Sequence, residues 1–276
     1  MSNLVSTEWL AAHLKDVRVV DASWYMPGEK RHPAGEFEVA HIPGAVFFDI
    51  DGIAGHATDL PHMMPAPGEF SKAVGDLGIG DGETVVVYDG AGIFSAPRVW
   101  WMLKAMGHAR VMVLDGGLPK WNREGRALEA GPANPKAKFF TAIAEPDLKR
   151  DFDAVMGIVK DKSAQLVDAR SPGRFTGSES EPRAGVRGGH MPGAANVHFR
   201  SLLTSEGTFK PPEQLSEIFA AADVDTQKPI VTSCGTGVTA AILLLALQDI
   251  GAKNVALYDG SWTEWGGRPE APVVRD

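Results

Sequence analysis

The sequence repeats itself once, because four short segments of the first half return in the same order in the second half. The pairs are Val19–Ser23 with Leu166–Arg170, His41–Ala45 with His190–Ala194, Val85–Gly90 with Ile230–Gly235, and Val113–Gly117 with Leu257–Ser261. Their offsets lie between 144 and 149 residues, and chance produces one such match but not an ordered series of four. Two copies are too few for a solenoid, so the sequence predicts two similar domains that arose by duplication.

The chain length and the region between the repeats fit this division. The 276 residues are enough for two domains of ordinary size. Gly131–Pro135 and Glu145–Asp147 lie between the repeats, and their prolines disfavour helix. We therefore expect a first domain over 1–127, a linker over 128–149 and a second domain over 150–276.

Short β-branched runs alternate with longer mixed segments in each half. The expected buried strands are 17–20, 84–88, 111–114, 165–167, 229–232 and 254–257. The expected helices are 1–15, which is amphipathic, and 96–106, 212–222 and 238–250. Pro212 suits a helix start, and Gly107 and Gly251 suit helix ends. This alternation predicts an α/β fold in which each domain is a mainly parallel sheet flanked by helices.

The composition argues against several classes of protein. A net charge of −8 does not fit a nucleic-acid binder, which needs a basic face. No run approaches 18 apolar residues, and the first residues lack the pattern of a secretory signal. Cys234 is the only cysteine, which excludes an internal disulfide and a multi-cysteine zinc site. We therefore expect a cytoplasmic protein without nucleic-acid or membrane partners.

Cys234 stands where chemistry is most plausible in such a fold. It follows the expected strand 229–232 and opens a short loop that leads into the expected helix 238–250. Sites in open α/β sheets form outside the carboxyl ends of the strands. Backbone amides curled by Gly235 and Gly237, together with a helix N-terminus, would stabilise a thiolate, which is the nucleophilic form of cysteine. The sequence thus indicates nucleophilic sulfur chemistry at Cys234.

Three other interpretations of the loop remain open. Free cysteine often packs as a small buried hydrophobe. A phosphate-binding loop needs Gly-Lys-Ser/Thr, and this loop has no lysine. A cysteine phosphatase needs an arginine at the far end of the loop to bind phosphate, where this chain has Thr239–Ala241. The last two interpretations are therefore disfavoured.

The segment Ser233–Ala240 resembles the active loop of tandem rhodanese-domain sulfurtransferases, and more narrowly the branch that uses 3-mercaptopyruvate. The resemblance covers nearly the whole chain and includes Asp21–Tyr25, Phe47–Asp51, Ser95–Trp101 and Tyr258–Trp262. The sister branch, which uses the thiosulfate dianion, typically has a Cys-Arg-Lys-Gly-Val-Thr loop, whereas this loop has no basic residue. The resemblance implies two rhodanese-like domains. The first would be catalytically inactive, since Asp89 stands there in place of Cys234; a catalytic acid is the alternative role for Asp89.

The resemblance also implies which residues bind the donor. Arg174 and Arg183 match substrate-binding arginines of the family, and Arg187 is a less certain third candidate. An arginine pair suits mercaptopyruvate because a guanidinium binds a carboxylate through two parallel hydrogen bonds. Solvated loop charges are the alternative interpretation of these arginines.

A proton relay drawn from both domains is implied as well. Carried over, it consists of Asp51, His62 and Thr236, where the family often has serine at the last position. The remaining loop residues are Gly235, Gly237, Val238 and Thr239. His41 and His190 recur in both halves beside Pro-Gly turns although only one half carries the cysteine, so we expect them to be structural.

The implied reaction moves sulfur from 3-mercaptopyruvate to Cys234 as a persulfide, releases pyruvate, and passes the outer sulfur to a thiol, thioredoxin or cyanide. It needs no metal and no organic cofactor. A thiosulfate sulfurtransferase is the first alternative, and a non-catalytic rhodanese module that binds a partner or carries sulfur is the second.

Overall fold

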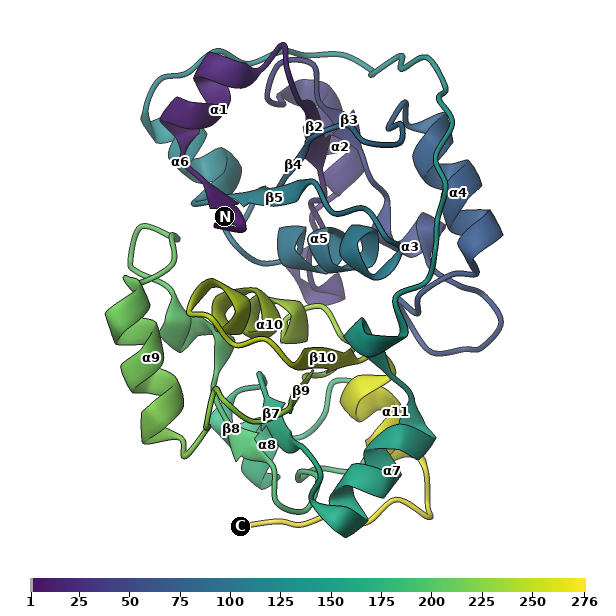
Figure 1. The fold of residues 1–276 in the computed structure, drawn as a ribbon, viewed down its shortest axis with the longest axis vertical. Helices are drawn as coiled ribbons and strands as arrows, with labels where there is room; N and C mark the ends of the chain where they lie inside the picture. The colour runs from purple at the N-terminus through teal and green to yellow at the C-terminus, as the bar shows by residue number, and fades with distance from the viewer. Residues whose placement is uncertain (1) are drawn as a thin grey trace. The chain divides into compact units, whose positions relative to one another are not determined.

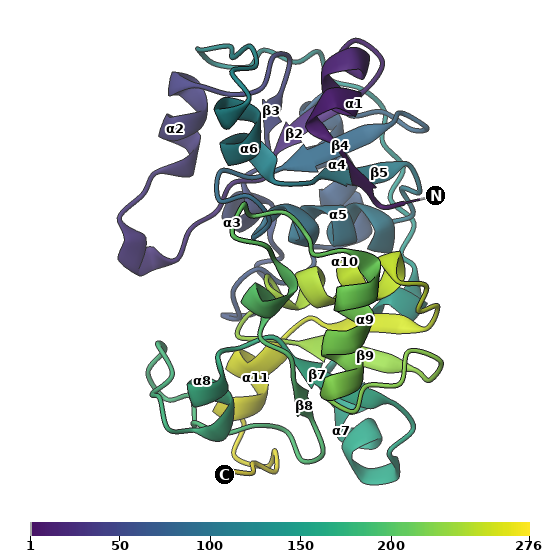
Figure 2. The same cartoon turned by 90° about the vertical axis from the view of Figure 1, so that its left-hand side faces the viewer.

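The computed structural model describes residues 2–276 and divides into two compact units. The first unit comprises residues 1–55, 64–145 and 203–209, of which Met1 lies outside the described residues. The second unit comprises residues 56–63, 146–202 and 210–276. The two units are shown in Figures 1 and 2. No helix within residues 2–276 has both the length and the apolar character needed to cross a membrane.

The first unit contains a parallel sheet of five strands in the order β1-β5-β4-β2-β3. Its strands are β1 (Leu4–Val5), β2 (Arg18–Asp21), β3 (Val46–Phe47), β4 (Val85–Tyr88) and β5 (Val111–Leu114). Its helices are α1 (Thr7–His13), the 3-10 helix η1 (Pro27–Glu29), α2 (Pro33–Val39), α3 (Ile50–Ile53), α4 (Pro67–Asp76), α5 (Ala96–Ala105) and α6 (Gly117–Arg123).

The second unit repeats this topology strand for strand, in the order β6-β10-β9-β7-β8. Its strands are β6 (Lys149–Arg150), β7 (Gln165–Asp168), β8 (Ala195–Asn196), β9 (Ile230–Ser233) and β10 (Val255–Tyr258). Its helices are η2 (Pro146–Leu148), α7 (Phe152–Asp161), α8 (Pro172–Thr176), η3 (Phe199–Leu202), α9 (Pro212–Ala221), α10 (Ala240–Asp249) and α11 (Ser261–Gly267). The identical strand order in both units confirms the predicted duplicated α/β fold.

Helices cover both faces of each sheet, which is why the strands are apolar on both sides. In the first unit, α1, α2 and α6 enclose one hydrophobic core, while α5 packs on β4 and β5. In the second unit, α7 and α11 enclose the corresponding core, and α10 packs on β9 and β10. Figure 1 shows α10 on one side of β9 and β10 and α7 and α11 on the other. The central strands β4 and β9 are therefore fully buried.

Two predicted segments differ from the structure. The expected helix over 1–15 is wrong in its first part, because Leu4–Val5 pairs as a strand with β5 and Ser6 caps a helix that begins only at Thr7. Met1 itself lies outside the described residues. The segment predicted as a linker over 128–149 packs on the first unit up to Glu145, for example through the bond from Gly131 N–H to Glu38 O. Tertiary pairing outweighs the local pattern at both places.

Candidate functional site in the second unit

Cys234 lies directly after the central strand β9, at the carboxyl edge of the second sheet. Its side chain is 1% exposed, and its Sγ accepts a hydrogen bond from Gly237 N–H at 3.1 Å. Gly237 has a φ of 81°, a left-handed conformation that glycine adopts without strain and that curls the loop back over the sulfur. Helix α10 begins at Ala240, two residues later than predicted, because Val238 and Thr239 form a turn. The loop therefore points a backbone donor at the sulfur, as the sequence suggested.

The first unit shows what a loop of this kind can hold. Asp89 follows β4 as Cys234 follows β9, and its fully buried carboxylate accepts four backbone N–H groups. The donors, at 2.8 to 2.9 Å, are Ala91, Phe94, Ser95 and Ala96. Their counterparts in the repeat are Thr236, Thr239, Ala240 and Ala241. A loop of this kind thus surrounds a buried carboxylate with backbone donors, which is the environment that a thiolate or persulfide needs.

The start of α11 is hydrogen-bonded to the backbone of the Cys234 loop. Ser261 Oγ accepts from Cys234 N–H at 3.2 Å, and Trp262 N–H donates to Cys234 O at 2.9 Å. Thr263 donates to Gly235 O through both its N–H and its hydroxyl, at 2.9 and 2.7 Å. These hydrogen bonds tie the backbone of Cys234 and Gly235 to the start of α11. The sequence did not predict this contact, although Tyr258–Trp262 already stood out within the repeat.

Arg174 lies beside the loop. Its helix α8 begins after Ser171, and a Cβ atom built on Gly235 would lie 3.1 Å from Arg174 Nη2. The guanidinium is held by Glu181, whose carboxylate accepts from Arg174 Nε at 3.2 Å and from Nη2 at 2.6 Å. The Glu181 side chain is 4% exposed and that of Arg174 is 22% exposed. Arg174 is therefore a fixed, partly accessible cation next to the residue that follows Cys234.

Arg170 extends this network, and the sequence analysis missed it. Its buried guanidinium donates to Asp168 Oδ2 at 2.7 Å and to Glu181 Oε1 at 2.8 Å, and it lies 4.2 Å from the centre of the Trp262 ring. Glu181 thus joins a buried arginine to the accessible Arg174. The signal in the sequence was that Asp168 and Arg170 lie in a repeated segment at the end of a strand.

His198 is a further polar group at the same edge of the sheet. It follows β8, and burial, aided by the charge of Arg200, lowers its pKa, while Glu179 opposes the shift. Its surroundings therefore favour the neutral imidazole. Sequence reasoning did not single out this histidine.

The other two candidate arginines differ in their surroundings. Arg183 is half-buried on the segment that connects Glu181 to His190. Arg187 donates to the backbone carbonyls of Gly266, Trp265, Arg268 and Ala271. Four carbonyl acceptors occupy the Arg187 guanidinium, so it ties its segment to the end of α11.

The residues expected to relay a proton belong to different parts of the structure. Asp51 is exposed in the first turn of α3 in the first unit, where it accepts from Trp24 Nε1 at 3.0 Å. His62 belongs to the 56–63 segment that groups with the second unit, is 4% exposed and has a left-handed φ of 61°. Thr236 is 8% exposed in the Cys234 loop. A left-handed backbone is uncommon for residues other than glycine, although histidine adopts it more readily than most, and it is often seen at functional sites.

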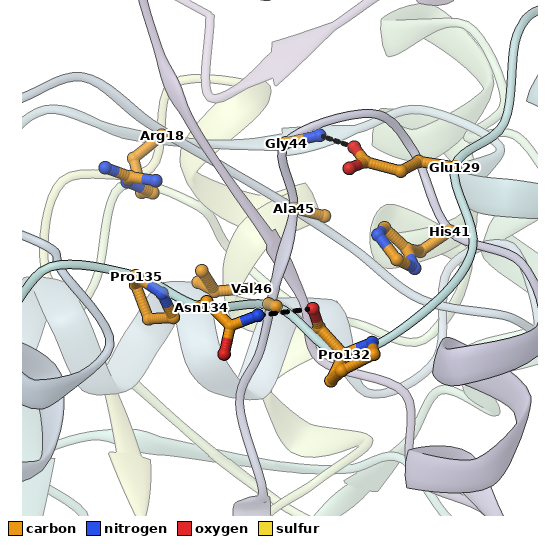
Figure 3. A pocket seen from close by; sticks show the side chains of 10 residues that line it. Arg18, His41, Gly44, Ala45, Val46, Glu129, Pro132, Asn134 and Pro135 are labelled. Atoms are coloured by element: carbon orange, nitrogen blue, oxygen red, sulfur yellow. Dashed lines mark hydrogen bonds between the residues drawn. The ribbon is translucent and has the colours of Figure 1, made fainter.

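His41 and His190 have matching structural roles. Nδ1 of His41 contacts Phe37 O at 2.7 Å, Nδ1 of His190 contacts Phe175 O at 3.1 Å, and each ring stacks on that phenylalanine. His41 also lines a pocket of about 320 Å³ in the first unit, in which Glu129 accepts from Gly44 N–H at 2.8 Å (Figure 3). Both histidines thus stabilise their turns, as predicted. Among residues 2–276, no group of three or more His, Cys, Asp or Glu side chains could hold a metal ion.

Comparison with known proteins gives the class first. The Rhodanese-like domain signature matches residues 6–124 and 151–268, which together cover most of the chain. The two units are therefore tandem rhodanese domains.

The relatives that match nearly the whole chain are named as sulfurtransferases. The mitochondrial thiosulfate/3-mercaptopyruvate sulfurtransferase 1 of Arabidopsis thaliana is 44% identical over 98% of this chain and 77% of its own length. The 3-mercaptopyruvate sulfurtransferase of Escherichia coli K12 is 43% identical over 98% of this chain and 96% of its own. The crystal structure of SseA, a 3-mercaptopyruvate sulfotransferase from Escherichia coli, matches with a TM-score of 0.87 and 40% identity, over 95% of this chain and 99% of that one. The chain belongs to the 3-mercaptopyruvate sulfurtransferase family.

Proposed function

We propose that the protein transfers sulfur from 3-mercaptopyruvate to an acceptor through a persulfide on Cys234. The Cys234 thiolate attacks the sulfur of the donor, a sulfur–sulfur bond forms, and the carbon–sulfur bond breaks. The electron pair of that bond leaves on the carbon skeleton as pyruvate enolate, which takes up a proton to give pyruvate. The thiolate of a small thiol or a thioredoxin, or cyanide, then attacks the outer sulfur and regenerates the Cys234 thiolate.

The observation that carries this proposal is the position of the Arg174 guanidinium beside Gly235. A donor whose sulfur meets Cys234 has its carboxylate only a few bonds away, within reach of a cation at that distance. Because Glu181 fixes the guanidinium in advance, its charge is in place when the enolate forms. Arg183 is the proposed second partner of the carboxylate, and the loop amides around Gly237 bind the sulfur.

We assign the proton relay to Asp51, His62 and Thr236 within the same proposal. The enolate carbon must receive a proton, and a hydroxyl in the cysteine loop is the donor that we assign to it. Thr236 is buried in that loop, and His62 is buried with an unusual backbone conformation. Thr236→Ala, which removes the hydroxyl, should slow pyruvate formation while the Cys234 nucleophile is retained.

The size of residue 235 favours mercaptopyruvate over thiosulfate. A Cβ atom on Gly235 would lie 3.1 Å from Arg174 Nη2, so a side chain at position 235, such as the arginine of thiosulfate-using loops, would require Arg174 to shift. A relative from Arabidopsis is named for both donors, which keeps thiosulfate as the second candidate. A reducing compartment such as the cytoplasm suits a chain whose single cysteine must act as a thiolate.

The test is a single-turnover reaction without acceptor, followed by steady-state assays with both donors. We expect one pyruvate per Cys234 in the first turnover and a higher kcat/KM for mercaptopyruvate than for thiosulfate. A higher kcat/KM for thiosulfate would reverse the choice of donor. Absence of the pyruvate burst would refute the covalent mechanism.

A further inference from the structure

The first unit contains a cavity of about 290 Å³ at the carboxyl ends of β2 and β4. Its lining includes Tyr25, Arg31, Glu36, Phe37, Gly90 and Asn122. Because the two units share one topology, this cavity lies at the edge of its sheet that corresponds to the Cys234 edge of the second unit. Gly90 follows Asp89 just as Gly235 follows Cys234.

The polar groups of this cavity repeat the catalytic arrangement with different residues. A Cβ atom on Gly90 would collide with the Tyr25 hydroxyl, just as one on Gly235 would crowd Arg174. The Tyr25 hydroxyl donates to Glu36 Oε2 at 3.0 Å, as Arg174 donates to Glu181. Tyrosine thus stands where the catalytic unit has its arginine.

A second residue, Arg31, supplies a guanidinium to this cavity. Arg31 donates to Glu36 through Nε at 2.9 Å and Nη2 at 2.5 Å, and its guanidinium lies 3.6 Å from the centre of the Tyr25 ring. Arg31 thus donates two hydrogen bonds to Glu36, as Arg174 donates two to Glu181. Nη1 of Arg31 has no hydrogen-bond partner within residues 2–276, so it is available to an acceptor.

The acidic groups near the cavity do not exclude an anion by charge repulsion. Four backbone N–H groups surround the Asp89 carboxylate, and Arg31 balances Glu36. Asp21 is buried, and this burial raises its pKa, which favours the neutral acid. Phe37 and Leu118 supply an apolar wall for a carbon skeleton.

We propose that this cavity is a non-catalytic binding site for a small monocarboxylate of the size of a 2-oxo acid. The carboxylate contacts Nη1 of Arg31, the Tyr25 hydroxyl keeps its hydrogen bond to Glu36 and so helps to hold the Arg31–Glu36 pair, and the short carbon chain packs against Phe37. Asp89 fills the loop where the catalytic unit has its nucleophile, so the ligand binds without being transformed. The proposal depends on the geometry of Arg31 and not on the reaction proposed for Cys234.

The test uses pyruvate as the probe and the full chain carrying Cys234→Ser and Arg174→Ala, which weakens binding at the catalytic loop. Titration followed by ligand-observed NMR or calorimetry is expected to show one saturable site. Adding Arg31→Ala should weaken that binding by about tenfold or more, the usual effect of removing a hydrogen bond to a charged group. Tyr25→Phe should weaken it less, and methyl pyruvate, which lacks the charge, should not compete.

Two control variants make the result specific. Lys30→Ala removes a neighbouring cation that does not line this cavity and should leave pyruvate affinity unchanged. Arg18→Ala alters another pocket of the same unit (Figure 3) and should also have no effect. No saturable binding in the starting variant, unchanged affinity in a folded Arg31→Ala protein, or loss of binding in Arg18→Ala would each overturn the proposal. Persulfide formation, measured separately on the chain with Cys234 and Arg174 intact, keeps this outcome distinct from failure of the proposed function.

Discussion

Glu181→Gln should lower kcat/KM for mercaptopyruvate, although the role proposed for Glu181 is to position Arg174 and not to act on the sulfur. The Glu181 carboxylate accepts from Arg174 Nε and Nη2 and from Arg170 Nη1, and it is almost fully buried. Glutamine has nearly the same shape but only one acceptor oxygen and no charge. Arg174 therefore loses at least one charge-assisted hydrogen bond and its fixed orientation, while Arg170 keeps Asp168.

The magnitude follows from that loss. One hydrogen bond to a charged group contributes about 1.5–3 kcal/mol. If this energy holds Arg174 in place for the enolate, kcat/KM for mercaptopyruvate falls roughly 10- to 150-fold. Since the enolate charge develops in the transition state, kcat should fall along with the apparent affinity.

Steady-state kinetics on four variants, namely Glu181→Gln, Glu179→Gln, Arg174→Ala and the Arg174→Ala/Glu181→Gln double variant, test this role. Glu179→Gln is the matched control, because Glu179 is an exposed carboxylate on the same segment that bonds Ser171, and kcat/KM should change less than about twofold. In an Arg174→Ala background, Glu181→Gln should add little, since two residues that act as a unit are not additive. Wild-type kcat/KM in Glu181→Gln, or full additivity with Arg174→Ala, would refute the positioning role.

Four further outcomes are expected. Cys234→Ser should abolish sulfur transfer but keep the thermal unfolding transition, because a hydroxyl is a far poorer nucleophile than a thiolate at neutral pH; substantial residual turnover would contradict this. Arg183→Ala should weaken mercaptopyruvate use by about 1.5–3 kcal/mol in kcat/KM, with only partial rescue by lysine; unchanged kinetics would mean that the carboxylate site is elsewhere. Asp89→Asn should lower the free energy of unfolding by at least about 2 kcal/mol, because four buried N–H groups lose a charged acceptor, while activity per folded molecule stays the same; equal denaturation midpoints would refute that view. Peroxide should inactivate the sulfur-free enzyme, with rescue by reductant only early in the exposure, and preloading with mercaptopyruvate should protect it, since Cys234 has no resolving cysteine; equal and fully reversible loss in both forms would argue against this.

The parts of the structure that the sequence predicted are those encoded by neighbouring residues. The strand before Cys234 is a β-branched run, and two glycines mark the loop that follows it, so both were visible locally. The duplication added the sheet topology, because the same segments had to form the same strands twice.

The parts that were not predicted depend on contacts between distant segments. Leu4–Val5 has the local pattern of the start of an amphipathic helix, but it forms a strand because it pairs with β5. The grip of Glu181 on Arg170 and Arg174 joins three residues whose side chains meet only after folding. The support of the cysteine loop by the start of α11 is likewise a tertiary contact, with no local pattern to announce it.

The most direct test of the Cys234 persulfide mechanism is the mass of Cys234 after one turnover. The protein is incubated with mercaptopyruvate in the absence of any acceptor, and the intact chain and its Cys234 peptide are weighed under non-reducing conditions. If Cys234 carries the persulfide, it gains the mass of one sulfur atom and one pyruvate is released for each modified Cys234. A thiol or cyanide then removes the added mass. An unmodified Cys234 peptide in a sample that has released pyruvate would contradict the central claim.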